Sequence, residues 1–251
     1  MEYLMYKLTW PEVEAYLEEN DLVILPVGST EQHGKHMAED NDAFTALAIA
    51  KRVAEKTGVL VAPVVPFGYS IHHMKFPGTI TLTFETLVRV YKEVCKSLLQ
   101  HGFKKIVIFN GHGGNTNPIA QAIREMREET GAIIYSIMVF PMERGFGSAS
   151  LKVLEQEGGG HACELETSIG LYLGQRVLLH KAEKWKPPTS QKEFYQKYQG
   201  KVATARNFDE ITESGSLGDP TLATMEKGEK LVEALIEEIS TFIEELKKLK
   251  V

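Results

Sequence analysis

Residues 31–42 read EQHGKHMAEDND and gather side chains that can bind metal ions. The candidates within this loop are Glu31, His33, His36, Glu39, Asp40 and Asp42. Imidazole nitrogen and carboxylate oxygen are suitable ligands for Zn²⁺, Mn²⁺ and Fe²⁺. A carboxylate has two oxygens, so Asp42 could bridge two ions, and ions about 3.5–4 Å apart can hold a hydroxide between them for hydrolysis. The loop therefore indicates a metal-dependent hydrolase.

Two further polar clusters have the same character. Residues 110–117 read NGHGGNTN, and residues 158–168 read GGGHACELETS. These clusters, the first loop and the segment SIHHMKFPGT at 70–79 hold all the histidines except His101 and His180. This concentration of histidine is the main evidence within the sequence for a functional site.

Each cluster also has a simpler interpretation. Asp42 precedes an apolar helix pattern and could be only its N-cap, and His36 could be a solvated loop residue or lie behind the ligands. The NGHGGN segment could be a plain turn, or a nest of backbone N–H groups that binds an anion. His161 could be a structural histidine, and Glu164 and Glu166 could simply favour the start of a helix. The metal centre is preferred because the three clusters converge on one place in the expected fold.

The elements that must position these clusters alternate between strands and helices. Apolar runs predict strands at 22–27, 59–65, 79–82, 105–110 and 132–140, and helical periodicity predicts helices at 43–58, 84–102 and 118–131. A last helix is expected after Asp219 as N-cap and Pro220 as its first residue. This order predicts an α/β fold with a central, mainly parallel sheet layered between helices. Ligands of such sheets bind beyond the carboxyl ends of the strands, where the polar clusters fall.

The length and composition are those of a globular protein. The 251 residues, with 43% hydrophobic and 25% charged residues, predict a single domain over 1–251. Residues 181–215 are polar with little periodicity, and we interpret them as an excursion or lid. The net charge of −6 argues against nucleic-acid binding. Apolar runs are too short for a membrane span. With two cysteines and no signal-peptide pattern, we expect a cytoplasmic protein.

Six segments of the sequence resemble the creatininase family of metal-dependent amidohydrolases. They are LPVGSTEQHGKHM, DNDAF, FGYSIHHMKFPGTITL, IFNGHGGNTN, GGHACELETS and GDPTLATMEKGE. They stand in the order typical of the family, and the resemblance extends over nearly the whole chain. It implies a layered α/β fold, two divalent metal ions (Zn²⁺, Mn²⁺ or Fe²⁺) and a homo-oligomer, often a hexamer. It also implies that a small-molecule amide, cyclic amide or formamide is hydrolysed at a non-peptide C–N bond.

The resemblance assigns roles to individual residues. Glu31, His33 and Asp42 match the first metal ligands, with Asp42 as the bridge, and His112 matches the ligand in the NGH turn. His161 matches a histidine that passes a proton to the leaving nitrogen after a metal-bridging hydroxide has attacked the carbonyl. The residues expected to bind the substrate are Gly113, Gly114, Asn115 and His73.

One departure from creatininase proper concerns the second metal. That branch has a carboxylate two residues after the turn histidine, where this chain has Gly114. Glu164 is the first candidate to replace it as a ligand, and Glu166 the second, with the other glutamate left to orient the catalytic His161.

The same departure bears on the substrate. NGHGGN and HACELETS look more like branches that contain an archaeal formamide hydrolase of flavin and deazaflavin biosynthesis, and a peptide-trimming enzyme of cofactor maturation. The candidate functions are therefore creatinine amidohydrolase and formamidopyrimidine-nucleotide deformylase. A peptide-trimming metalloprotease and a non-catalytic metal-binding subunit are the alternatives.

Overall fold

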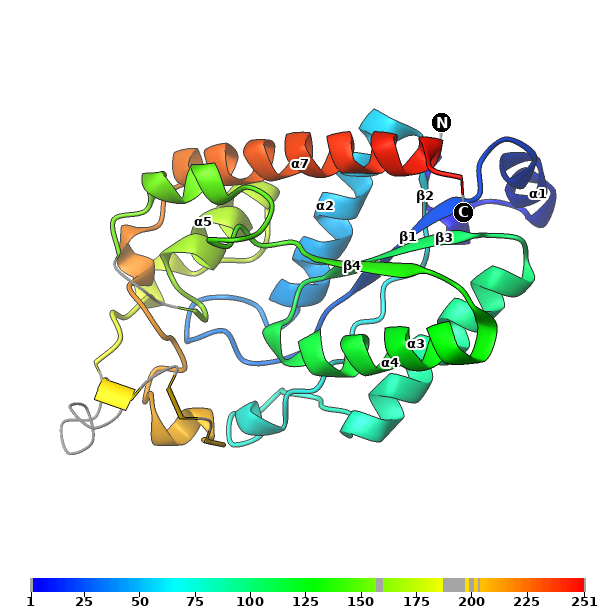
Figure 1. The fold of residues 1–251 in the computed structure, drawn as a ribbon. Helices are drawn as coiled ribbons and strands as arrows, with labels where there is room; N and C mark the ends of the chain where they lie inside the picture. Colours follow the sequence, from blue (N-terminus) through cyan, green and yellow to red (C-terminus); the bar gives the residue numbers. More distant parts are fainter. Residues whose placement is uncertain (1, 157–159, 187–196, 199–200, 203, 251) are drawn as a thin grey trace.

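The central element is a parallel sheet of four strands in the order β2-β1-β3-β4 (Figure 1). The computed structural model describes residues 2–250 except 157–159, 187–196, 199–200 and 203. The strands are β1 (Leu22–Val27), β2 (Leu60–Val61), β3 (Lys105–Asn110) and β4 (Ile134–Met138). Val27 pairs with Asn110, and Asn110 with Met138, so the carboxyl ends of three strands coincide at one edge.

The helices account for most of the remaining described chain. The α-helices are α1 (Trp10–Glu19), α2 (Asn41–Thr57), α3 (Phe84–Gln100), α4 (Thr116–Thr130), α5 (Glu164–Leu173) and α7 (Met225–Lys248). Short 3₁₀ turns are η1 (Met5–Lys7), η2 (Ile71–His73), η3 (Gly113–Asn115), η4 (Ser148–Val153), η5 (Leu179–Lys181), η6 (Phe208–Glu210) and η7 (Pro220–Leu222).

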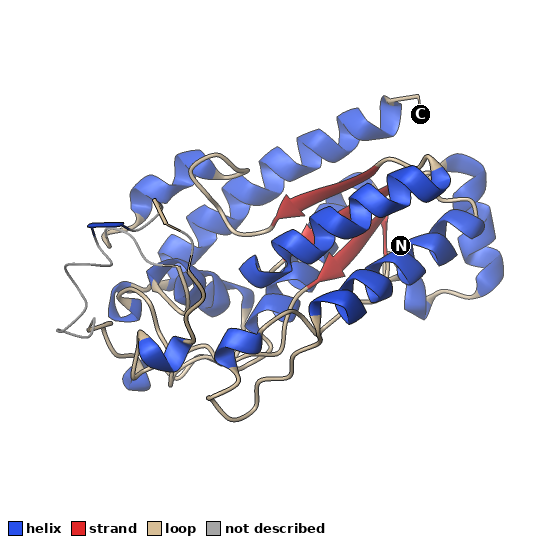
Figure 2. Cartoon of the chain, turned by 60° about the horizontal axis from the view of Figure 1, so that its bottom comes forward, coloured by secondary structure: helices blue, strands red, loops and turns tan. Residues whose placement is uncertain are grey.

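Helices cover the sheet on both faces, as Figure 2 shows. Side chains of a strand alternate between faces. Accordingly, Leu22 and Ile24 of β1 pack with α2, α5 and α7, whereas Val23 and Leu25 pack with α3, α4 and α1. The two cores explain why the strands are apolar throughout. The expected α/β/α architecture with a parallel sheet is therefore confirmed.

The ends of the helices follow from local sequence. The αL conformation of Gly58, with φ of 71°, ends α2. The side chain of Thr83 caps α3 by accepting a hydrogen bond from the backbone N–H of Thr86 at 3.3 Å. Thr224 caps α7 in the same way through the N–H of Lys227 at 3.2 Å. These caps place the starts of the helices at defined points around the sheet.

Two of the expected strands are wrong in extent. Residues 79–82 do not join the sheet: they form only isolated bridges, Ile80 with Thr30 and Thr81 with Gly68. The run at 59–65 contributes only Leu60 and Val61 to a strand. Pro63 follows directly and has no N–H for the ladder, which limits this strand.

The start of the last helix also differs from expectation. The side chain of Asp219 accepts a hydrogen bond from the N–H of Thr221 at 3.2 Å, so Asp219 caps the short turn η7. The long helix α7 begins later, at Met225. The proposed excursion at 181–215 lies partly outside the described residues, and the division of the chain into one domain stays a prediction.

Within the described residues, no helix has both the length and the apolar character that a membrane crossing requires.

Candidate metal centre

Two glycines bring the first turn of α2 against the ends of β1 and β3. A Cβ added at Gly111 would lie 2.1 Å from the backbone oxygen of Asp42, and one at Gly28 would lie 2.3 Å from the nitrogen of Ala43. Side chains at these positions are therefore excluded. Asp42 is the second residue of α2, and the N-cap is Asp40. The interpretation of Asp42 as a mere N-cap is wrong for this structure.

The carboxylate of Asp42 lies between two imidazole rings. His33 Nε2 is 3.0 Å from Oδ1, and His112 Nδ1 is 3.0 Å from Oδ2. All three side chains are buried. Each oxygen of one carboxylate thus faces a different histidine, which is the arrangement that a carboxylate bridging two ions requires.

Backbone contacts orient both histidines toward Asp42. His33 Nδ1 lies 3.0 Å from the carbonyl oxygen of Glu31, so it donates there and leaves Nε2 free for the cluster. His112 Nε2 lies 3.2 Å from the carbonyl oxygen of Tyr69, which leaves Nδ1 free. The free Nδ1 of His112 is also 3.3 Å from Glu31 Oε1. Both rings are therefore held in the tautomer that a metal ligand needs.

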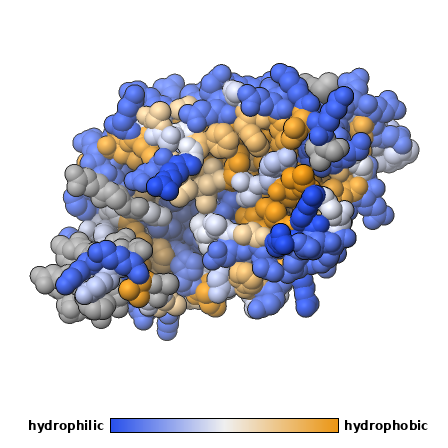
Figure 3. All heavy atoms as spheres, in the orientation of Figure 1, coloured by the Kyte–Doolittle hydropathy of each residue, from blue (hydrophilic) through white to orange (hydrophobic). Residues whose placement is uncertain are grey.

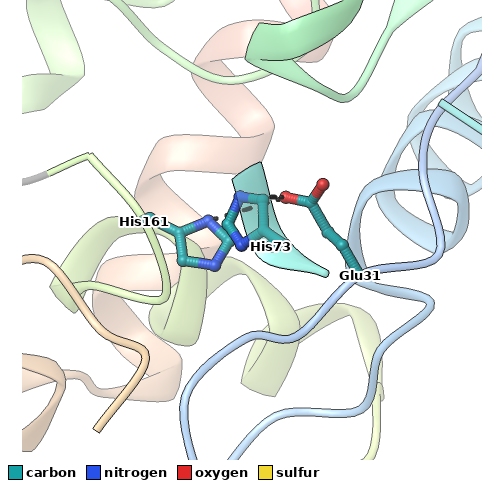
Figure 4. A group of neighbouring side chains, drawn as sticks. All are labelled: Glu31, His73 and His161. Atoms are coloured by element: carbon teal, nitrogen blue, oxygen red, sulfur yellow. Dashed lines mark ion pairs between the residues drawn. The ribbon is translucent and has the colours of Figure 1, made fainter. Parts of the chain in front are cut away.

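Glu31 lies at the centre of a second contact set, drawn in Figure 4. His73 Nε2 is 3.4 Å and His161 Nδ1 is 3.8 Å from Glu31 Oε1. These two histidines come from the turn η2 and from the segment before α5, far apart in the sequence, and they meet at one carboxylate. The structure thus brings the ligands predicted from the first loop together with His112, His161 and His73.

The two glutamates of α5 lie in different surroundings. Glu166 Oε2 is 3.8 Å from His33 Nε2, so this carboxylate lies at the cluster. Glu164 points away from the cluster: its carboxylate lies 2.5 Å from Lys227 Nζ and accepts the N–H of Gln156 at 2.8 Å. The preference for Glu164 as a ligand is therefore corrected, because this carboxylate is already paired with a lysine. Glu166 has the position expected of the replacement.

The turn after β3 contributes less to the cavity than expected. Gly113 and Gly114 line the cavity, but the amide of Asn115 is buried and donates to the oxygen of Gly28 at 2.9 Å. Asn115 therefore supports the turn, which corrects its predicted contact with substrate. A Cβ at Gly114 would lie 2.4 Å from His112 Nε2 and 2.4 Å from the oxygen of Tyr69. A carboxylate at position 114 is thus incompatible with the hydrogen bond that orients His112.

The charges of the cluster are strongly coupled. Burial alone would lower the pKa of His33, but Asp42 and Glu166 outweigh it and raise the pKa to about 10. Burial likewise opposes the charge of His112, yet Glu31 and Asp42 hold its pKa well above the usual value. Burial raises the pKa of Glu166 to about 7. The carboxylates therefore create a negative potential that favours positive charge, either protons on the histidines or metal cations.

The donor atoms fit divalent metal ions. Glu31 Oε2, His33 Nε2 and Asp42 Oδ2 are buried and accept or donate no hydrogen bond within the described part of the chain. Three groups have ligand atoms close enough for one ion: Glu31, Asp42 and His112; His33, His161 and Glu166; and Glu31, His73 and His161. Mixed nitrogen and oxygen donors suit Zn²⁺, Mn²⁺ and Fe²⁺. The donor atoms of the site therefore suit divalent metal ions.

Some residues at the site were missed in the sequence. Phe208 of η6 packs over the cluster, with its ring centroid 3.9 Å from that of His73 and 4.8 Å from that of His161. Gln32 lies between His73 and His161. His36, expected in solvent or behind the ligands, is 1% exposed, and its Nε2 lies 2.9 Å from Thr167 Oγ1. Phe208 had no motif to identify it, whereas Gln32 stands between two predicted ligands and could have been considered.

A large cavity opens onto the cluster. Its volume is about 1140 Å³, and its wall includes Glu31, Asp42, His112, His161 and Glu166. Its wall also includes apolar residues at the end of β4 and after it, among them Met138, Phe140, Met142 and Phe146. The cavity thus joins a polar end, where the candidate metal ligands lie, to an apolar extension.

Comparison with known proteins identifies a family and several relatives of this chain. The family model described as Creatininase, creatinine amidohydrolase, matches residues 6–243. Creatinine amidohydrolase of Pseudomonas putida is 39% identical over 48% of this chain and 50% of its own length. A 3-dehydro-scyllo-inosose hydrolase of Thermotoga maritima is 29% identical over 95% of this chain and 82% of its own length. The mycofactocin precursor peptide peptidase of Mycolicibacterium smegmatis is 30% identical over 86% of this chain and 81% of its own length.

Solved structures of creatininases have the same fold as this chain, and the descriptions of two of them name metals. A structure described as Creatininase Mn matches with a TM-score of 0.83 and 27% identity, over 99% of this chain and 100% of the other. A mutant creatininase described as Zn-Zn type matches with a TM-score of 0.83 and 28% identity over the same shares. Structural neighbours of the fold therefore bind Mn and Zn.

Proposed function

Because the chain belongs to the creatininase family and is a hydrolase of that family, we propose that it uses two divalent metal ions to hydrolyse an amide-type C–N bond. The observation that carries the proposal is the position of Asp42, whose two oxygens face His33 and His112 at 3.0 Å each. The substrate class follows from the amidohydrolases among its relatives, and creatinine and formamidopyrimidine nucleotides are the first candidates.

The ligands divide into two sets that share Asp42. Glu31, Asp42 and His112 would hold one ion. His33 and Glu166 would hold the other together with the second oxygen of Asp42, which lies 3.0 Å from His33 Nε2. Ions bound there would supply an activated water and a Lewis acid for the carbonyl oxygen. Zn²⁺, Mn²⁺ and Fe²⁺ all suit these donors, so we propose two ions without a choice among the three.

The protein's own groups complete the reaction. His161 Nδ1 faces Glu31 in the cavity wall, and burial, together with the nearby His33, holds the pKa of His161 well below its usual value. A neutral imidazole there can accept a proton from the attacking water and pass it to the leaving nitrogen. Phe208 covers this end of the cavity and limits the entry of bulk water.

The size of the cavity favours a second candidate. A volume of about 1140 Å³ exceeds the ~300–1000 Å³ that is typical of pockets for drug-sized ligands. A peptide end could occupy the apolar extension along Phe140, Met142 and Phe146 while its last amide reached the metal ligands. This supports the peptide-trimming metalloprotease as the alternative.

A homo-oligomer, such as the hexamer typical of the family, is part of the proposal. Strand β4 is at the end of the order β2-β1-β3-β4, so its outer edge has no neighbour within the described sheet. Ile133 and Met142 on either side of it are 39% and 52% exposed. Apolar residues gather across the middle of this face in Figure 3. A partner copy that covers this face would bury them, and light scattering would give the number of subunits.

The buried free thiols of Cys95 and Cys163 support our further proposal that the enzyme works in the cytoplasm, where thiols stay reduced.

A substrate panel on metal-reconstituted protein tests the function. The chain is stripped of metal, loaded with Zn²⁺, Mn²⁺ or Fe²⁺, and assayed with creatinine, formamides, cyclic amides and short peptides. We expect two ions per chain and hydrolysis of one class, lost on chelation and restored by metal. Binding of fewer than two ions, or activity that survives chelation, would refute the two-metal hydrolase. Cleavage of peptides alone would favour the second candidate.

A further inference from the structure

The side chain of Gln32 lies between the two histidines that are not assigned to either metal set. Gln32 Nε2 is 2.9 Å from His73 Nδ1 and 3.1 Å from His161 Nε2. Gln32 is 5% exposed and stands between the candidate ligands Glu31 and His33 in the sequence. One amide therefore contacts both rings from behind the cavity.

Two backbone groups fix the orientation of this amide. Its Oε1 accepts the N–H of Gly34 at 3.0 Å, and its Nε2 donates to the carbonyl oxygen of Gly215 at 3.1 Å. A flipped amide would place N–H against N–H and oxygen against oxygen. An amide nitrogen has two hydrogens, so the one not used on Gly215 is directed to His73 Nδ1, and none is left for His161 Nε2.

The tautomer of His73 follows from this contact. Because Nδ1 accepts from Gln32, the ring proton of neutral His73 is on Nε2. His73 Nε2 lies 3.4 Å from Glu31 Oε1, at the cavity end of the ring. His73 thus presents an N–H donor to the cluster and offers no lone pair to a metal there.

His161 has the opposite arrangement. Its Nε2 lies 2.6 Å from the backbone oxygen of Gln32. Two lone pairs could not approach so closely, so Nε2 carries the proton and donates it to this carbonyl. The lone pair of neutral His161 is then on Nδ1, which is 3.8 Å from Glu31 Oε1. His161 thus presents a proton acceptor to the same carboxylate that faces the donor of His73.

We propose that Gln32 is a positioning residue that fixes the ring proton of His73 through its side-chain amide and that of His161 through its backbone carbonyl, so that His73 presents a donor and His161 an acceptor to the metal centre. The inference rests on the proposed function for its chemistry. During hydrolysis, a C–O bond forms from water and the C–N bond breaks. His161 Nδ1 takes the proton of the water and gives it to the leaving nitrogen, while His73 Nε2–H donates to the oxygen that becomes negative.

Nitrogen NMR of the histidine rings tests the proposal without any substrate. Protein labelled with ¹⁵N-histidine is recorded at one fixed pH, metal-free and loaded with Zn²⁺, and His73 is assigned from the spectrum of His73→Asn. We expect the Nε2–H tautomer for His73 and for His161. In Gln32→Glu the new carboxylate accepts from Nδ1, so His73 is expected to change to the Nδ1–H tautomer. Gln121→Glu, which makes the same change on the exposed face of α4, should leave the spectrum as it is.

Kinetics on an identified substrate provide the second measurement. Gln32→Glu should keep two metal ions and lose about 10²-fold in kcat with little change in KM, because one donor to the oxyanion is removed. Gln32→Met keeps the volume of the side chain and removes its hydrogen bonds, and it replaces Gln32→Glu if that variant does not fold. Its His73 should populate both tautomers.

The NMR result decides the proposal even if no substrate is found. A wild-type His73 with its proton on Nδ1, or a His73 tautomer that is unchanged in both Gln32 variants, would overturn it. Gln32 would likewise be reduced to a structural role if its variants lost thermal stability but the tautomers of His73 and His161 stayed as in the wild type. A failed substrate panel with the expected tautomers would count against the proposed function alone.

Discussion

Lys227 and Glu164 form an ion pair where α7 meets α5, with Lys227 Nζ 2.5 Å from Glu164 Oε1. The glutamate side chain is fully buried, and the lysine side chain is 14% exposed. The same carboxylate accepts the backbone N–H groups of Glu155 and Gln156 at 2.8–3.1 Å. The pair thus holds the segment before His161 against the start of α5, which also carries Glu166. Its contribution is to stability, and the metal centre lies elsewhere.

Replacement of the lysine should separate stability from metal binding. In Lys227→Met, the buried carboxylate of Glu164 loses its cation, and breaking such a pair typically costs about 3–5 kcal/mol. We expect a loss of about 3 kcal/mol in the free energy of unfolding, measured by urea denaturation, with two metal ions still bound. The double variant Lys227→Met with Glu164→Gln should recover part of this loss. Loss of metal from a folded Glu164→Gln protein would reinstate Glu164 as a ligand.

Asp42 and Asp40 form a matched pair for testing the bridge. Asp42→Asn keeps the shape of the side chain but removes the charge shared by His33 and His112, so we expect the loss of most bound metal, measured by elemental analysis. Asp40→Asn changes the N-cap of α2, where asparagine is an equally good residue, and should keep both ions. Equal metal content in the two variants would contradict the bridging role of Asp42.

Much of this site could be predicted because the candidate metal ligands follow strands. The residues Glu31, His33, Asp42 and His112 come directly after β1 or β3, or at the start of α2, so the order of elements and one family resemblance were sufficient to group them. The three strand ends coincide because β1, β3 and β4 are parallel and in register.

The choice between the glutamates could not be made from sequence. Glu164 and Glu166 are two positions apart on α5, so their side chains point in different directions from a helix. Which of them faces His33 depends on Lys227, which is 63 positions away and pairs with Glu164. Phe208 was equally inaccessible, because it reaches the site from a polar segment that has no periodicity. Asn115 was misassigned because a turn residue and a substrate contact have the same sequence pattern.

Glu166 should weaken the metal-free protein as pH rises. Burial raises its pKa from 4.5 to about 7, so the folded protein binds this proton more tightly than the unfolded chain does. The contribution of this proton to the stability of the folded protein is complete below about pH 4.5 and is lost as pH rises through about 7. Glu166→Gln does not titrate, so at pH 8 the metal-free variant should be more stable than the wild type by about 3 kcal/mol, at about 1.36 kcal/mol per pKa unit.

The same variant should bind one ion fewer. Urea denaturation at pH 5 and pH 8 measures the change in stability, and elemental analysis measures the metal. A variant that is more stable when metal-free but retains one ion would show that Glu166 is kept for function at the expense of stability. Equal stability of variant and wild type at both pH values would mean that burial does not raise the pKa of Glu166. Two ions bound to the variant would mean that Glu166 is not a ligand.

His161 should be needed for catalysis more than for metal binding. Its Nε2 is engaged by the carbonyl of Gln32, and its Nδ1 faces the cavity 3.8 Å from Glu31. His161→Ala should therefore fold, keep two ions and lose about 10²–10⁴-fold in kcat on the substrate that the panel identifies. The exposed His101 lies outside the site, so His101→Ala is the control and should keep full activity. Added imidazole should restore part of the activity of His161→Ala, since a small base can occupy the vacated space. His161 belongs to two of the three groups of candidate ligands. If His161→Ala loses an ion instead, His161 is a metal ligand, and another group must supply the proton to the leaving nitrogen.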